Sequence, residues 1–289
     1  MKPFQSLPRF VLVFGVALGA ACFVPLPRVV AQAENKKADE EKVRLEDDAL
    51  AKQRLAVMHE RIAAFGVAGK KEGLPERFEA KPIFRYTDPA RGIVSAAIWR
   101  LGTTGRPKAL ISTELYPMFY GQPRIVYEFL SLTDIPFKAA SNDYHWQPTS
   151  SALTMKSFPK SSQPAAAATA RLLQLKQLAK RFTACEIDAE KRCELRLMPT
   201  PIERYSPGEA DRADGAVFLL SFGINPEALL FIESDGTEWT YGFARLSGAA
   251  SITAELDEAP AWEVGPSELG SSSNYTATNA PAKIPGVDP

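Results

Sequence analysis

The sequence contains few of the residues that build metal and nucleophile sites. Its 289 residues include two histidines, His59 and His145, and three cysteines. No H-E-x-x-H motif, no zinc-spaced cluster of histidine, cysteine and acidic residues and no Asp-rich calcium loop occurs. G-x-x-x-x-G-K-[ST], G-x-G-x-x-G and G-x-S-x-G are missing as well. We therefore expect no metal, no cofactor and no serine-esterase site.

The chain carries no excess of either charge, with 34 basic and 34 acidic residues. Removing an N-terminal leader that holds Lys2, Arg9 and Arg28 leaves 31 basic residues against 34 acidic ones, a net charge of about −3. A basic footprint for nucleic acid or for an anionic membrane surface is thus missing, and we expect neither partner.

Residues 1–33 have the pattern of an export signal. Lys2 and Arg9 precede the apolar run of residues 10–21, and Ala31-Gln32-Ala33 forms a small-x-small cleavage site. The apolar run is short for a bilayer span, although the apolar residues of 23–30 leave an uncleaved anchor as the alternative. We expect a periplasmic or extracellular product that begins near Glu34 and keeps no stable membrane span.

The charged segment of residues 34–80 contains an amphipathic helix. Its apolar residues recur at steps of four and three, which places them on one helical face: Ala51, Leu55, Met58, Ile62 and Phe65. Gly66 and Gly69 end the pattern. We expect this helix to pack on the body of the protein, with a short dimeric coiled coil as the alternative.

Two blocks of strand-forming sequence, residues 81–160 and 185–264, echo each other. The matches are Pro82, Ile83, Arg85 and Tyr86 with Pro201, Ile202, Arg204 and Tyr205; Gly92 with Gly215; Glu114 with Glu233; and Tyr127 and Phe129 with Tyr241 and Phe243. An ordered Pro-Ile-x-Arg-Tyr opening followed by later matches indicates an internal repeat. Each block has the alternation and turn signals of an antiparallel β-meander.

A crossover helix is expected between the two blocks, within the linker of residues 161–184. Leu172, Leu175, Leu178 or Ala179, and Phe182 form its apolar stripe. We expect the helix to pack on the core, with a membrane-surface helix as the alternative. Residues 265–289 have few apolar side chains and are predicted to be a disordered tail. The expected fold is therefore α+β and mainly antiparallel β, with two repeated meanders joined by a helix.

Cys185 and Cys193 flank a segment that suits a tight turn. A hairpin at Asp188 to Lys191 could place the two thiols opposite each other, and export would permit a disulfide. Two separate thiols are the alternative.

The candidate catalytic residues are Glu114 and Glu233, because a duplicated unit could supply one acid from each half. A pair of carboxylates roughly 5 to 10 Å apart is typical of a glycoside hydrolase. The Asp-Thr-Gly or Asp-Ser-Gly signature of aspartic proteases does not occur. The alternative, which we favour, is that each glutamate forms a structural ion pair with Arg85 or Arg204 of its own half.

Aromatic residues supply the other candidate site. Phe119 and Tyr120 precede a glycine turn, and Tyr144, His145 and Trp146 stand together among polar residues. Such rings could line a groove for a glycan or peptide, or they could cap one end of the sheet core.

Five segments carry a family resemblance: KPIFRYTDPARG, LLQLKQLAKRF, CELRLMPTPIERY, DRADGAVF and NPEALLFIESDG. Together they resemble an uncharacterised family of exported proteins of planctomycete-type bacteria, over most of Lys81 to Trp262. The resemblance implies export and a shared fold, and it implies no activity. The sequence thus favours a non-catalytic module that binds a protein or cell-envelope component or has a structural role there, with an acid hydrolase at the seam of the repeats as the alternative.

Overall fold

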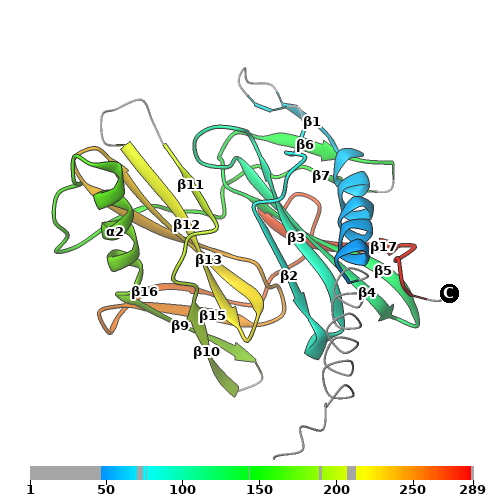
Figure 1. The fold of residues 1–289 in the computed structure, drawn as a ribbon. Coiled ribbons are helices and arrows are strands. Elements are labelled where there is room, and N and C mark those ends of the chain that lie inside the picture. Colours follow the sequence, from blue (N-terminus) through cyan, green and yellow to red (C-terminus); the bar gives the residue numbers. More distant parts are fainter. Residues whose placement is uncertain are drawn as a thin grey trace, which may run out of the picture. The chain divides into compact units, whose positions relative to one another are not determined.

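The computed structural model describes residues 47–69, 74–75, 77–142, 144–188, 191–206 and 213–287. The predicted export signal and residues 34–46, the first part of the charged segment, lie outside these residues. Asp48–Pro289 form one compact unit. Within the described residues this unit has three antiparallel sheets and two α-helices, so the expectation of a mainly antiparallel α+β fold is confirmed (Figure 1).

The first large sheet has five strands in the order β17-β5-β4-β3-β2. Its strands are β2 (Phe84–Asp88), β3 (Ile93–Leu101), β4 (Ala109–Phe119), β5 (Gln122–Ser131) and β17 (Tyr275–Pro281). A short 3-10 helix, η1 (Pro89–Arg91), joins β2 to β3. Beside this sheet lies a small one in the order β1-β6-β7, formed by β1 (Gly66–Gly69), β6 (Phe137–Ala140) and β7 (His145–Trp146).

The prediction of a disordered tail was wrong. Residues Tyr275–Pro281 pair with β5 in continuous register, from Tyr275 opposite Leu130 to Pro281 opposite Arg124. Tyr275 and Ile284 are buried. A strand that joins an existing sheet obtains its hydrogen bonds from the neighbouring strand, so two buried anchors suffice where composition alone indicated disorder.

The second large sheet has nine strands, with β11 beside β12 and the others in the order β16-β15-β9-β10-β12-β13-β14-β8. They are β8 (Lys156–Ser157), β9 (Phe182–Asp188), β10 (Lys191–Leu197), β11 (Glu203–Tyr205), β12 (Ala213–Phe222), β13 (Asn225–Asp235), β14 (Trp239–Arg245), β15 (Ser251–Leu256) and β16 (Ala259–Val264). Lys156 Nζ on β8 donates to the carbonyl of Ala261 on β16 at 2.7 Å. The sheet therefore curls until its two ends meet.

The two large sheets pack face to face through a shared apolar layer. Ile98, Leu110 and Leu130 of the five-stranded sheet belong to one buried cluster with Val217, Leu219, Leu229 and Phe231 of the nine-stranded sheet. Burial of each such side chain is worth about 1.5 to 3 kcal/mol. This layer is the centre of the fold.

Each outer sheet face is covered by a helix (Figure 1). The helix of residues 47–63 buries Met58 and Ile62, and Phe65 just beyond it, in a cluster with Trp99 and Phe129, as its apolar spacing predicted. Helix α2 (Ala168–Ala179) buries Leu175, Leu178 and Ala179 against the nine-stranded sheet.

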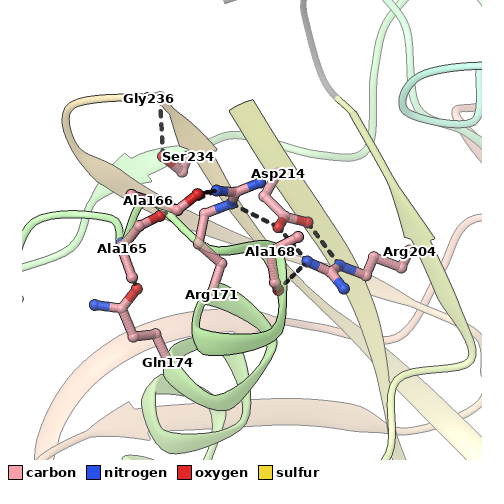
Figure 2. Close-up of polar contacts among 9 residues, drawn as sticks. All are labelled: Ala165, Ala166, Ala168, Arg171, Gln174, Arg204, Asp214, Ser234 and Gly236. Atoms are coloured by element: carbon pink, nitrogen blue, oxygen red, sulfur yellow. Dashed lines mark hydrogen bonds and ion pairs between the residues drawn. The ribbon is translucent and has the colours of Figure 1, made fainter. Parts of the chain in front are cut away.

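The start of α2 is held by a buried charge network instead of a side-chain cap. Ala167 at its N-terminus makes no side-chain capping bond. Arg171 of α2 and Arg204 of β11 both bind the buried carboxylate of Asp214 on β12, with Nε distances of 2.9 and 2.8 Å (Figure 2). Arg204 also donates to the carbonyl of Ala168 at 2.6 Å. The network fixes α2 to both strands.

Each large sheet contains the same tyrosine–glutamate contact across a small residue. Tyr205 pairs with Gly215, which pairs with Glu233, and the Tyr205 hydroxyl donates to Glu233 Oε1 at 2.6 Å. The equivalent positions in the five-stranded sheet are Tyr86, Ala96 and Glu114, also with a 2.6 Å bond. Register therefore matches Gly215 with Ala96, so the sequence match of Gly215 with Gly92 was wrong.

We expect Gly215→Val to destabilise the protein by about 3 kcal/mol, because a Cβ there would lie 2.5 Å from Cε2 of the Tyr205 ring. The ring would have to move away from Glu233 and leave a buried carboxylate short of a donor. Chemical denaturation measures the effect. The matched control is Gly265→Val, since that exposed glycine has no atom within 4 Å of a built Cβ. Equal loss of stability in both variants would contradict the assignment.

Candidate functional site

The two candidate catalytic glutamates lie on the inner faces of different sheets and are almost completely buried. Glu114 on β4 is 6% exposed and Glu233 on β13 is 5% exposed. Glu114 accepts hydrogen bonds from Tyr86 at 2.6 Å and Tyr116 at 2.8 Å. Glu233 accepts bonds from Tyr205 and from Arg106, whose Nε and Nη2 lie 2.6 and 2.5 Å from its two oxygens. These separate partner sets leave little of either carboxylate open to a substrate.

The predicted ion pairs of these glutamates with Arg85 and Arg204 were wrong. Successive residues of a strand point to opposite faces, so the tyrosine of each Arg-Tyr pair faces inward and the arginine faces away. Tyr86 and Tyr205 therefore take the bonds assigned to Arg85 and Arg204. Arg85 is exposed, and Arg204 binds Asp214 instead.

Three arginines of the five-stranded sheet and its turns reach carboxylates of the nine-stranded sheet. Arg106 binds Glu233, Arg100 binds Glu203 at 2.6 Å, and Arg91 binds Glu227 at 3.0 Å. We call these three contacts the inter-sheet bridges. Nothing in the spacing of these arginines indicated partners more than one hundred residues away.

Carboxylates accumulate at the Arg91 end of the inter-sheet layer. Burial raises the pKa of Glu114 against the opposing effect of its two tyrosine donors, and burial together with the charge of Glu114 raises the pKa of Glu128. Burial and the nearby charge of Glu186 raise the pKa of Glu227 to about 7. Glu128 accepts a bond from Tyr275 at 2.8 Å. This cluster has more acids than compensating cations, and sequence motifs gave no sign of Glu128 or Glu227.

The candidate binding aromatics separate into three environments. Trp146 is fully buried, donates to the carbonyl of Ser273 at 2.8 Å and packs on Phe129 and Phe137, so it belongs to the core. Its assignment to a binding groove was wrong. Tyr120 is 84% exposed at the β4–β5 turn and makes an edge-to-face ring contact with Phe119. His145 is exposed, whereas Tyr144 is half-buried and lines a pocket.

That pocket is one of two adjoining compartments, which together we call the β17 groove. The smaller compartment has a volume of about 190 Å³ and is lined by Glu60, Arg61, Tyr127, Asn142, Tyr144 and Asn279, among others. The larger has a volume of about 810 Å³ and is lined by Glu60, Arg61, Val57, Pro123, Ala282 and Ile284, among others. Helix 47–63, the β4–β5 hairpin and the C-terminal strand thus meet at one surface. Its smaller part is tyrosine- and amide-lined, and its larger part is mainly apolar.

The predicted disulfide between Cys185 and Cys193 was wrong. The expected hairpin does form, with Asp188 opposite Lys191, but Cys185 pairs with Glu194 and Cys193 pairs with Glu186. The two cysteines are thus one residue out of register and point to opposite faces of the hairpin. Both are free thiols.

Comparison of the chain with protein-family models, with curated proteins and with solved structures finds no match. Within the ranges that the structure describes, no helix has both the length and the apolar character to cross a bilayer. The same residues include no group of three or more histidine, cysteine or acidic side chains placed to hold a metal ion.

We expect Glu227 to make stability fall as pH rises. Its pKa is raised from near 4.5 to about 7, so its stabilising contribution is fully present below pH 4.5 and is lost as pH rises through about 7. The full effect is on the order of 3 kcal/mol. In denaturation series from pH 4.5 to 8, Glu227→Gln should flatten this decline, and the exposed Glu238→Gln should leave it unchanged. An unchanged slope in Glu227→Gln would refute the assignment.

Proposed function

We propose that the protein is an exported, non-catalytic binding module of the cell envelope and that its ligand binds in the β17 groove. The basic start, apolar run and Ala-Gln-Ala site of residues 1–33 support export. The groove is the observation that carries the binding role, because three segments distant in sequence build a concave surface with apolar and polar compartments.

The lining of the groove favours a ligand held by ring contacts and neutral hydrogen bonds. Tyr127 and Tyr144 present rings, Asn142 presents an amide, and Glu60 and Arg61 carry opposite charges. The side-chain oxygen of Asn279 instead accepts a bond from Arg124 at 2.6 Å. Tyrosine rings with amide groups suit envelope polymers such as peptides and glycans. Tyr144 stacks on Phe129 at a centroid distance of 5.3 Å, which holds its ring in place before a ligand arrives.

The acid-hydrolase alternative has less support. It requires two carboxylates that share one accessible space, at roughly 5 to 10 Å. Glu233 is neutralised by Arg106, while Glu114 is held by two tyrosines, and both are buried. Their arrangement favours a structural role in each sheet.

We also infer that β2–β5 and β11–β14 are copies of one unit, with the segment that contains α2 connecting them. Both runs of strands pair consecutively as antiparallel meanders. In each, the hydrogen-bonded tyrosine and glutamate are 28 residues apart. Tyr127 and Tyr241 also fall opposite corresponding residues, Thr113 and Ile232.

Binding in the groove should depend on Tyr144. We expect soluble peptidoglycan fragments or a pool of short peptides to raise the unfolding midpoint of the purified protein. At a ligand concentration one hundred times the dissociation constant, the free energy of unfolding should rise by about 2.7 kcal/mol. Tyr144→Ala should weaken binding at least tenfold, and His145→Ala, the exposed neighbour, should not. A ligand lost in Tyr120→Ala instead would place the site at the β4–β5 turn, and no midpoint shift with either probe would argue against the proposal.

A further inference from the structure

We propose that the ligand of the β17 groove is an extended peptide segment that adds to the outer edge of β17 as a further strand. The inference rests on the proposed function and names the class of ligand. It follows from the backbone groups of β17, which forms one edge of the five-stranded sheet, opposite the edge formed by β2.

The direction of these backbone groups follows from the pairing of β17 with β5. The amide of Ser131 donates to the carbonyl of Asn274, and the amide of Ala282 donates to the carbonyl of Pro123. Hydrogen-bonded pairs alternate along an antiparallel ladder, so the even-numbered residues 276, 278 and 280 direct their N–H and C=O groups to β5. Ala277 and Asn279 therefore direct theirs outward. No backbone partner for these outward groups occurs in the described ranges.

The smaller compartment of the groove lies beside this same stretch of β17. Thr278, Asn279 and Ala280 line it on the strand side, and Glu60 and Arg61 line it from the helix. Asn142 and Tyr144 supply a third side. A strand bound at Ala277 and Asn279 would place alternate side chains toward this compartment, whose volume of about 190 Å³ admits one apolar or aromatic side chain.

The paired donors and acceptors of the edge distinguish a peptide from a glycan. Ala277 and Asn279 each present one N–H and one C=O, two residues apart, and a peptide strand repeats the complementary pair at the same interval. A sugar chain has hydroxyls but no such repeat. Pro281, which occupies the next outward-facing position, lacks an N–H, and its carbonyl accepts a bond from Arg61 at 3.3 Å. The free edge thus ends at Asn279.

The test uses a matched pair of substitutions at Asn279. Asn279→Pro removes one outward N–H without removing a bond to β5, and natural Pro281 shows that the strand holds proline at an outward position. Asn279→Ala keeps the N–H and is the control. Phage-displayed random peptides panned on the purified protein provide the probe. We expect Asn279→Pro to bind the enriched peptide at least tenfold more weakly and Asn279→Ala to bind it within about threefold of the original chain.

A second arm leaves the protein unchanged. N-methylation of alternate backbone amides of the enriched peptide should abolish binding in one register and leave it nearly intact in the other, because only every second amide faces β17. Equal tolerance of both registers, or unchanged affinity in Asn279→Pro, would overturn the peptide-strand inference. Binding of peptidoglycan fragments that is lost in Tyr144→Ala, with no peptide enriched, would overturn it while preserving the proposed function. If neither the random peptides nor the peptidoglycan fragments bind, both the peptide-strand inference and the proposed function are contradicted.

Discussion

The inter-sheet bridges are the interactions on which the arrangement of the two large sheets depends. All three arginines come from the five-stranded sheet and its turns, and all three glutamates come from the nine-stranded sheet. A buried carboxylate without its partner would cost several kcal/mol, so a slipped packing of the sheets is disfavoured. The apolar layer holds the sheets together but is non-directional. The bridges determine how one sheet is positioned on the other.

The bridges also explain why the two tyrosine–glutamate contacts differ. Arg106 donates one hydrogen bond to each carboxylate oxygen of Glu233, and Tyr205 donates a further bond to the same carboxylate. Glu114 has Tyr116 as its second donor, and a neutral hydroxyl compensates a buried charge less than a guanidinium does. Buried carboxylates near Glu114 are therefore incompletely compensated by cations, and burial raises the pKa values of Glu114 and Glu128. That end of the layer is thus sensitive to pH, while the β17 groove lies on the outer side of the same sheet.

Sequence reasoning predicted most of the helices and strands, but it did not predict the contacts that depend on strand register or on pairing between distant segments. The periodicity of Met58, Ile62 and Phe65 predicted the face of the N-terminal helix that is buried. The Arg-Tyr pairs were recognised, yet the choice between adjacent residues required knowing which one faces inward. In the same way, Cys185 and Cys193 differ by one residue in the register of their hairpin and therefore point to opposite faces.

The missed strand and groove share one physical cause. β17 is stabilised by hydrogen bonds to a strand about 150 residues earlier in the chain, and its own composition contains little sign of them. Of the candidate aromatics, Trp146 is buried in the core, where its indole N–H donates to the carbonyl of Ser273. Ser273 lies just before β17 in the chain. Tyr144 alone among them lines the groove, where long-range pairing creates the concavity.

The most direct test of this account is a double-mutant cycle on Arg106 and Glu233. Unfolding free energies of Arg106→Met, Glu233→Gln and the double variant give the coupling between the two side chains. If the bridge fixes the packing of the sheets, each single variant should lose about 3 kcal/mol, and the coupling should be on the order of 2 kcal/mol or more. Strictly additive losses of unfolding free energy, with a coupling near zero, would contradict the claim that this bridge fixes the packing of the sheets.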